Sequence, residues 1–509
     1  MEIAKLLRDI PVSEAKLTVQ HAGGVTSDSR RVRPGDLFLC IRGHTHDGHR
    51  YISDALERGA AAVLAETKES IPEGTEYILT PDTRLAEALV WNNWYDRPAD
   101  GMKRIGITGS NGKTSTAYLL RDLLLADGRK PGCITTIRSA AGLEEIPIEA
   151  GGSSVADAAG AMTTPDPEYF YGAIARMRER GCDTLIYEAS SHALALRKTD
   201  GVLPDIALFT NLTPEHMDYH GTMENYLAAK ARLFSMAKTG ILHLEDPYAE
   251  ALMELAPNCC YLTCTADPAR FAESDSAAMR IRTHGTEGLS FLYCGRDAIF
   301  RVQTPLVGRY TVYNILLAVT CGLHLGADPF TIRKTLAAAV SPAGRMQRVE
   351  TGDAPFSVFI DYAHTPAALE QVLITAREMH PAKLTVLFGC GGDRDRSKRP
   401  VMGKIAGQYA DRVVLTDDNP RTEDPAQIRE EILAGMTDTP PYMVLPDRRE
   451  AIRQVIREAA PGEMILLCGK GHETYEIRGK TKTPFDEAEI VREAVSSRKR
   501  SDAGQHEKE

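Results

Sequence analysis

Short apolar runs alternate with longer amphipathic segments along most of the chain, and turn-forming residues separate them. This alternation predicts α/β domains with mostly parallel sheets. Between residues 99 and 345 the strand-like runs are KRIGIT, DTLIYEA, DIALFTNL and TGILHLE, and helices are expected over 114–126 and 226–237. Shorter strand-like runs follow after about residue 265, and a helix is expected over 313–325.

Two further blocks flank this central one. Residues 1–98 combine a helix-like ISDALERGA with a strand-like AAVLAE, which predicts a small mixed α/β domain. A Pro- and Gly-containing stretch near 95–102 is expected to link it to the next block. Residues 346–497 contain SVFIDYA, KLTVLFGC, DRVVLTDD and EMILLCGKG between helix-like segments, which predicts a doubly wound, Rossmann-like domain. Residues 498–509 are expected to be a solvated or frayed tail.

Composition limits the classes of function. The length of 509 residues fits about three domains. The 60 basic and 70 acidic residues give a net charge of −10, which argues against a broad electrostatic surface for nucleic acid. No apolar stretch approaches the roughly 20 residues of a membrane span, and the N-terminus lacks the layout of a signal peptide. Ten cysteines in a chain of this length fit a reducing compartment, so a cytoplasmic protein is expected.

The segment RIGITGSNGKTST at 104–116 joins an apolar strand to a glycine-rich loop, a Lys-Thr pair and a helix. Backbone N–H groups of such a loop surround phosphate oxygens, and the start of the helix adds unpaired donors. The common form of this motif has glycine where Ile107 stands, so this is a variant phosphate loop. The expected nucleotide-binding residues are Gly109, Ser110, Asn111, Gly112, Lys113, Thr114 and Ser115.

Three residues outside the loop are candidates for magnesium chemistry. Glu188 ends the apolar strand TLIYE, where a carboxylate can complete a phosphate-loop metal site together with Thr114. His216 follows another apolar strand, and a neutral imidazole can bind a metal. Lys230 lies on or beside an apolar helix face, where a lysine is costly unless it is paired or modified. The residues alone leave a snorkelling lysine and a modified lysine both open.

Together these segments resemble the Mur ligase family over nearly the whole chain. TGSNGKTS, EASSHAL, NLTPEHMDYHGTMENYLAAKARLF, DYAHTP, FGCGGDRDRSKRP, DDNPRTEDP and GKGHE occur in the order found in that family. The resemblance is strongest to the members that add the third residue of the peptidoglycan stem peptide. It implies an ATP- and Mg²⁺-dependent ligase with a UDP-binding first domain, a central ATPase domain and an amino-acid-binding last domain, acting as a monomer.

The resemblance also assigns residues by position. It implies that Lys113, His216 and Lys230 are catalytic, that Thr114, Glu188 and His216 bind Mg²⁺, and that Lys230 is carbamylated and adds a metal ligand. The UDP-N-acetylmuramoyl dipeptide is expected at Ser29, His44, Thr163, Thr164, Ser190 and Arg197. Further ATP contacts are expected from Asn314, Arg345, Asp361 and His364.

In the family, the segment DNPR accompanies meso-diaminopimelate as the amino-acid substrate. Two arginines could bind the carboxylates of this substrate bidentately, and polar groups could receive its distal ammonium and carboxylate. The expected residues are Arg394, Asp418, Asn419, Pro420, Arg421, Gly469 and Glu473. Lysine or ornithine would leave a buried arginine unpaired, at a cost of a few kcal/mol.

Other interpretations remain open at this point. The same ligase could use L-lysine or L-ornithine, or the chain could be a ligase similar to folylpolyglutamate synthase, although that family lacks the first domain with TSDSR and GDLF. A P-loop regulatory NTPase is a more distant alternative. The Gly-, Ala- and Ser-rich stretch 138–162 is longer than the loop usual in the family, and Met162 replaces a common asparagine.

Overall fold

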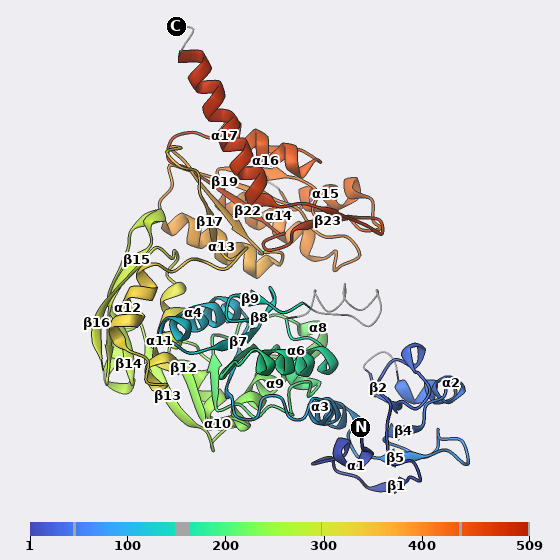
Figure 1. The fold of residues 1–509 in the computed structure, drawn as a ribbon. Helices are drawn as coiled ribbons and strands as arrows, with labels where there is room; N and C mark the ends of the chain where they lie inside the picture. The colour runs from blue at the N-terminus through green and yellow to red at the C-terminus, as the bar shows by residue number, and fades with distance from the viewer. Residues whose placement is uncertain (44–46, 148–162, 297, 437–439, 507–509) are drawn as a thin grey trace. The chain divides into compact units, whose positions relative to one another are not determined.

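The computed structural model describes residues 1–43, 47–147, 163–296, 298–436 and 440–506, and Figure 1 labels its helices and strands. The chain divides into two compact units. The first contains residues 1–277, 295–297 and 314–332, and the second contains residues 278–294, 298–313 and 333–509. The predicted α/β class with mostly parallel sheets is confirmed.

The N-terminal part of the first unit is built on a five-stranded sheet of order β1-β5-β4-β3-β2. Only β1 is antiparallel to its neighbour. The apolar runs on β3 and β4 are wholly buried, as expected for strands covered on both faces. The elements are α1 (Ile3–Leu6), β1 (Glu14–Lys16), β2 (Val25–Thr26), η1 (Ser29–Arg31), β3 (Leu37–Leu39), η2 (Gly48–Tyr51), α2 (Ile52–Glu57), β4 (Ala62–Ala65), β5 (Tyr77–Leu79) and α3 (Thr83–Trp94).

The expected linker at 95–102 is a folded connection. Two of its side chains, Ala99 and Met102, are buried in the core of the first unit. Helix α3 ends at Trp94, and the connection then makes tight turns in which Asp96 and Arg97 have positive φ. The Pro and Gly residues therefore mark a turn that packs against its neighbours.

The second sheet contains the phosphate loop. Strand β6 lies between β11 and β10, and all three are parallel. Strands β10 and β7 lie on one side of β6, and β11 and β12 lie on the other, so the order of the strands reverses at β6. Ligands of open α/β sheets bind at such a switch point. The strands are β6 (Lys103–Thr108), β7 (Pro131–Ile134), β8 (Ser139–Ala141), β9 (Glu144–Glu145), β10 (Thr184–Glu188), β11 (Ile206–Phe209), β12 (Thr239–His243), β13 (Cys260–Thr265), β14 (Ser276–Thr283), β15 (Leu289–Gly295) and β16 (Ile299–Thr304).

Antiparallel strand pairs form both edges of this sheet. Its order is β16-β15-β14-β13-β12-β11-β6-β10-β7-β8-β9, and β7-β8, β8-β9 and β15-β16 are antiparallel. Part of the predicted loop 138–162 thus forms β8 and β9, whereas residues 148–162 lie outside the described residues. The helices are α4 (Lys113–Ala126), α6 (Pro167–Glu179), α7 (Ser191–Ala195), α8 (Met217–His220), α9 (Met223–Ser235), α10 (Ala249–Leu255), η3 (Pro268–Glu273), η4 (Gly285–Glu287), α11 (Thr311–His324) and α12 (Pro329–Ala337).

The second unit contains a six-stranded sheet of order β17-β18-β22-β19-β20-β21, in which only β17 is antiparallel. On β22, Met464 and Leu466 face the core of α13 (Pro366–Glu378), α14 (Lys398–Tyr409) and α15 (Pro425–Leu433). Ile465 and Leu467 face the core of α16 (Arg448–Arg457) and α17 (Glu487–His506). This alternation confirms the doubly wound prediction. The strands are β17 (Gln347–Val349), β18 (Ser357–Asp361), β19 (Lys383–Phe388), β20 (Arg412–Leu415), β21 (Tyr442–Val444) and β22 (Glu463–Cys468).

Residues 498–506, the greater part of the expected solvated or frayed tail, are helical. Helix α17 continues to His506, and Arg498 Nη1 donates to the carbonyls of Ile456 and Ala459, 2.7 and 2.9 Å away. These bonds satisfy carbonyls at the end of α16. The remaining elements are α13 (Pro366–Glu378), α14 (Lys398–Tyr409), α15 (Pro425–Leu433), α16 (Arg448–Arg457), β23 (Tyr475–Arg478), β24 (Thr481–Pro484) and α17 (Glu487–His506).

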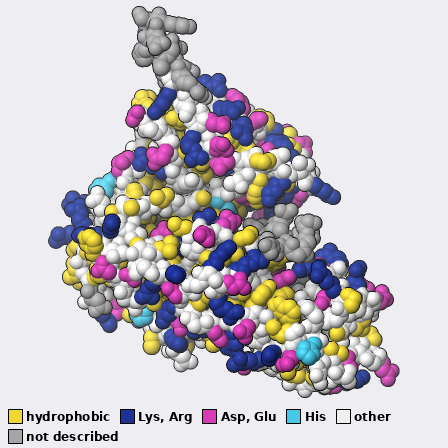
Figure 2. Space-filling model, in the orientation of Figure 1, with side chains coloured by type: hydrophobic (Ala, Val, Ile, Leu, Met, Phe, Trp, Pro, Cys, Tyr) yellow, Lys and Arg dark blue, Asp and Glu magenta, His cyan; other side chains and the backbone are white. Residues whose placement is uncertain are grey.

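On the face drawn in Figure 2, basic and acidic side chains are interspersed. All ten cysteines are free thiols. In the part of the chain that the structure describes, no helix is long and apolar enough to cross a bilayer.

Candidate functional site

The phosphate loop lies between β6 and α4, as the sequence predicts. Gly112 begins the helix with φ +85°, and Gly109 has φ +146°, which side chains rarely adopt. A Cβ at Gly109 would lie 1.9 Å from Thr210 Oγ1, and one at Gly112 would lie 2.5 Å from Asn314 Oδ1. Both glycines are therefore required by conformation and by space.

The loop packs on the segment that follows β11. Ser110 N donates to the carbonyl of Asn211 over 2.8 Å, and Asn111 N donates to Asn211 Oδ1 over 3.0 Å. Thr210 Oγ1 donates to the Asn111 carbonyl over 2.6 Å. These bonds hold the loop backbone in a defined shape. Lys113 Nζ donates to the carbonyls of Gly109 and Ser110, 2.8 and 2.7 Å away, so its ammonium lies over the loop.

Thr114 and Glu188 are brought together as expected. Glu188 is fully buried at the end of β10, and its carboxylate accepts from Thr114 Oγ1 at 2.7 Å. It also accepts from the amide and hydroxyl of Thr136, both at 3.0 Å. Hard oxygen ligands of this kind suit Mg²⁺. Thr136 was not predicted as a site residue, because it lies in the turn between β7 and β8, where the sequence contains no motif.

His216 and Lys230 lie near each other and near the loop lysine. His216 begins α8 with φ +59°, and its ring centroid is 4.7 Å from that of His192. Burial lowers the pKa of His216, and the positive charges of Lys113 and Lys230 lower it further against the opposing effect of Glu215. The described residues contain no group of three or more His, Cys, Asp or Glu that could hold a metal.

Lys230 lies on α9, and its side chain is buried. Its side chain is 1% exposed, and its ammonium lies 4.4 Å from the centroid of the Tyr226 ring. Burial, and then the charge of Lys113, hold its pKa well below the ordinary value for lysine. No hydrogen bond or ion pair of this ammonium with another described residue is present. A lysine in such surroundings is readily neutral, which is the form that reacts with carbon dioxide.

Asn314 also lies beside the loop. Its Oδ1 accepts from Thr116 Oγ1 at 3.3 Å, whereas its Nδ2 is buried without a hydrogen-bond partner among the described residues. An unpaired buried amide costs about 1–3 kcal/mol, so this group is available to a ligand.

The other three predicted nucleotide contacts lie in the second unit, around Tyr362. The Arg345 guanidinium lies over the Tyr362 ring, 5.2 Å from its centroid. His364 Nδ1 lies 2.8 Å from the Tyr362 carbonyl, and Asp361 precedes Tyr362 at the end of β18.

Of the predicted sugar and dipeptide contacts, the structure brings Thr164 and Ser190 together. Thr164 Oγ1 donates to the Glu188 carbonyl at 2.7 Å and accepts from Ser190 N at 3.0 Å, next to Thr163. Arg197 pairs with Asp82 at 2.9 Å and with Asp200 at 3.3 Å. Ser29 is buried at the start of η1, the short helix between β2 and β3. His44 lies outside the described residues.

The DNPR segment follows β20, and its first three residues, Asp418, Asn419 and Pro420, are buried. Asn419 Nδ2 donates to Glu473 Oε2 at 2.7 Å, and Asn419 Oδ1 accepts from Lys470 Nζ at 3.0 Å. Burial and the nearby Asp418 raise the pKa of Glu473. Gly469 has φ +112°, and a Cβ there would lie 2.8 Å from Asp418 Oδ2.

Arg421, after Pro420, has φ +52° and donates from Nη1 to the Gly392 carbonyl at 2.7 Å. No described carboxylate pairs with its guanidinium. A Cβ on Gly391 would lie 2.9 Å from Arg421 Nη1 and 4.0 Å from Arg394 Cγ, which places both predicted arginines beside one glycine. Lys470 and Arg399 are fully buried, and neither was predicted as a site residue. Lys470 belongs to the motif GKGHE and Arg399 to GDRDRSKRP, but the role of each depends on partners that are distant in the sequence.

Together, the switch-point loop, its Lys-Thr pair and the buried strand-end carboxylate define an α/β protein of the P-loop nucleotide-binding class. Comparison with known families narrows this class. Residues 21–105 match the Mur ligase family catalytic domain, residues 107–322 the Mur ligase middle domain, and residues 344–471 the Mur ligase glutamate ligase domain. The chain belongs to the Mur ligase family.

Individual relatives agree with this assignment. A protein from Syntrophomonas wolfei named UDP-N-acetylmuramoyl-L-alanyl-D-glutamate--2,6-diaminopimelate ligase is 38% identical over 97% of this chain and 99% of its own. A protein of the same name from Chlorobaculum tepidum is 41% identical over 92% and 91%. A solved structure of a ligase with that name is 29% identical, with a TM-score of 0.69 over 98% of this chain and 99% of its own.

The folylpolyglutamate synthase of Mycobacterium tuberculosis, solved with ADP, shares the fold only in part. It is 21% identical, with a TM-score of 0.61 over 76% of this chain and 92% of its own. The full-length relatives therefore favour the peptidoglycan branch over this alternative.

Proposed function

We propose that the chain is an ATP-dependent ligase that joins meso-2,6-diaminopimelate to UDP-N-acetylmuramoyl-L-alanyl-D-glutamate in peptidoglycan precursor synthesis. The observation that carries the choice of amino acid is the geometry at Arg421, whose guanidinium has no described carboxylate partner and lies beside Arg394 and the Asn419–Glu473 pair. A substrate with a carboxylate and an ammonium at its distal end complements this arrangement. L-lysine and L-ornithine lack the second carboxylate and would leave the arginine unpaired.

The reaction begins with activation of a carboxylate. An oxygen of the D-glutamate γ-carboxylate attacks the γ-phosphorus of ATP, the bond to the ADP oxygen breaks, and an acyl phosphate forms. Two anions meet in this step, so neutralising charge is the main task of the protein. We assign this role to Lys113 and to the N–H groups of Gly109, Ser110, Asn111, Gly112, Thr114 and Ser115, with Asn314, Arg345, Asp361 and His364 as further contacts of the nucleotide.

We propose that Thr114, Glu188, His216 and Lys230 hold Mg²⁺. Thr114 and Glu188 supply hard oxygen atoms, His216 supplies an imidazole, and a carbamylated Lys230 would supply further oxygens. Carbamylation joins the neutral Lys230 nitrogen to the carbon of CO₂ and releases a proton, which replaces a neutral amine by an anion whose oxygen atoms can bind a metal. Bound Mg²⁺ would neutralise phosphate charge.

The amine of diaminopimelate then attacks the acyl carbon, and the tetrahedral intermediate expels phosphate. Asp418, Asn419, Pro420, Arg421, Arg394, Gly469 and Glu473 orient the amino acid for this attack. Ser29, His44, Thr163, Thr164, Ser190 and Arg197 hold the UDP-sugar dipeptide. One chain supplies all of these residues, so we propose a monomer. Because its nucleotide substrates are intracellular metabolites, we propose that it acts in the cytoplasm.

The test measures phosphate release with Mg²⁺-ATP and UDP-N-acetylmuramoyl-L-alanyl-D-glutamate, with meso-diaminopimelate, L-lysine or L-ornithine added separately. We expect turnover with diaminopimelate alone and a product heavier by one diaminopimelyl residue. Turnover with lysine or ornithine would retain the ligase and reject the proposed amino acid. Absence of turnover with all three would reject the proposed reaction.

A further inference from the structure

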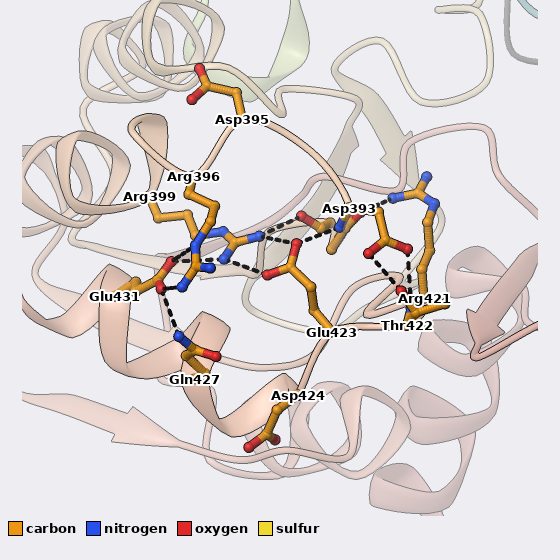
Figure 3. A network of polar contacts seen from close by, with 12 residues as sticks. Asp393, Asp395, Arg396, Arg399, Arg421, Thr422, Glu423, Asp424, Gln427 and Glu431 are labelled. Carbon is orange, nitrogen blue, oxygen red and sulfur yellow. Dashed lines mark hydrogen bonds and ion pairs between the residues drawn. The ribbon is translucent and has the colours of Figure 1, made fainter.

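A third arginine, Arg399, is buried near Arg394 and Arg421, the two arginines that are predicted to bind the amino acid. Arg399 on α14 is 0% exposed, and its Nη1 donates to Glu423 at 2.9 Å and to Glu431 at 2.7 Å. Its Nη2 donates to the second oxygen of Glu423 at 3.0 Å. Figure 3 shows the guanidinium between the two carboxylates, with Arg396 as a further partner of Glu431. A buried cation needs such pairing because its desolvation is costly.

The carboxylates of Glu423 and Glu431 differ in their other hydrogen-bond partners. Glu423 also accepts from the backbone amide of Asp393, and the Asp393 carboxylate in turn accepts from the amide and hydroxyl of Thr422 at 3.1 and 2.8 Å. The other partners of Glu431 are Arg396 and Gln427. Thus Glu423 joins the network to the loop 391–394, whereas Glu431 joins it to α15 (Figure 3).

Arg399 also contacts the loop itself, since its Nη2 lies 3.3 Å from the Gly391 carbonyl. The loop ends in Arg394, and the segment tied to it begins with Arg421, whose Nη1 bonds the Gly392 carbonyl. The separation of the two arginines therefore depends on the bonds that join these backbones. A binding site works only when its groups are held within about 0.5 Å of the geometry that its ligand needs.

We propose that Arg399, acting through Glu423, is a positioning residue that sets the separation of Arg394 and Arg421 and so favours an amino acid with two carboxylates. This inference rests on the proposed function, and it assigns no contact between Arg399 and the substrate. Glu431 balances the charge of the network and contributes to its stability without setting the separation.

Glu423→Ala and Glu431→Ala form a matched pair, because each removes one carboxylate from Arg399 and only the first breaks the link to the loop. We expect Glu423→Ala to raise the KM for meso-diaminopimelate by about tenfold or more, with kcat within about threefold. The KM values for ATP and the UDP-dipeptide should stay unchanged. Glu431→Ala should change the KM for diaminopimelate less than about twofold.

Arg399→Lys is the second variant, because it keeps the charge but removes the planar fork that spans both carboxylates. It should raise the KM for diaminopimelate as Glu423→Ala does. If circular dichroism shows that Glu423→Ala does not fold, Arg399→Lys replaces it in the test. Equal KM values in the two alanine variants, or an increase shared with ATP, would overturn the positioning role while wild-type turnover upholds the proposed function. A wild-type enzyme that does not use diaminopimelate would overturn both.

Discussion

The phosphate loop of the first unit and the amino-acid segment of the second unit hold their polar groups in different ways. The loop residues 109–115 are consecutive, and their shape is set by two left-handed glycines and by hydrogen bonds to residues 210–213. The amino-acid segment is assembled from residues 391–394, 418–423 and 469–477, which ion pairs and side-chain bonds hold together. The first site is built into the backbone, whereas the second depends on distant side chains.

This difference predicts how each site fails. A change in the phosphate loop should reduce the rate with every amino acid, because the loop serves the activation of the carboxylate. A change in the amino-acid segment should alter the choice and affinity of one substrate, because activation precedes its use. The following experiments test this separation, beginning with the largest expected effect.

Lys113→Met should lower kcat by about 10²- to 10³-fold with every amino acid offered, because it removes a cation that neutralises the transferring phosphoryl group. The measurement is phosphate release at saturating substrates. The melting temperature should change little, since the hydrogen bonds between the loop and residues 210 and 211 remain. A loss confined to diaminopimelate would contradict the assignment of Lys113 to activation.

Lys230→Met should lower kcat by about 10²-fold, since the proposed carbamate and its charge are lost. In the wild type, burial lowers the pKa of Lys230, so the neutral amine is available at lower pH than for an ordinary lysine. Activity should therefore decline in CO₂-free buffer and return when bicarbonate is added. The Lys113→Met protein serves as control, because its residual activity should respond to bicarbonate in the same proportion. Activity independent of bicarbonate would reject the carbamate.

Arg421→Lys should lower kcat/KM for diaminopimelate by about 10- to 100-fold, because an ammonium cannot replace a bidentate guanidinium. The rate with ATP and the UDP-dipeptide at saturating amino acid should fall far less. The comparison is steady-state kinetics in which diaminopimelate is varied, and then ATP is varied at saturating diaminopimelate. An equal loss of kcat/KM for both substrates would show that Arg421 does not bind the second carboxylate.

The smallest effect concerns acid stability. Hydrogen bonds from Arg396, and then from Arg399, lower the pKa of Glu431 to about 2. Its stabilising contribution is therefore present above the unfolded pKa of about 4.3 and is lost as the pH falls toward the folded value. Glu431→Gln should flatten the decline of melting temperature between about pH 5 and 3. Glu378→Gln, at the exposed end of α13, is the control and should leave the decline unchanged.

Local sequence predicts the elements of both units well. The run KRIGIT is β6 residue for residue, and the expected helix over 114–126 starts one residue earlier at Lys113. Parallel strands covered on both faces are apolar over their whole length, so their runs are visible in the sequence. The end of α17 was not visible in this way, because its polar residues 498–506 resemble a solvated tail.

The sequence by itself determined the phosphate loop, since strand, glycines, Lys113 and helix are adjacent and backbone conformation depends on neighbouring residues. It also determined the family, because its motifs occur in order along the whole chain. Only the tertiary structure decided that Arg399 is buried between Glu423 and Glu431, that Thr136 joins Thr114 at Glu188, and that Lys470 holds Asn419. A charged residue reads as solvated until folding brings its distant partners within bonding distance, because pairing is what makes its burial possible.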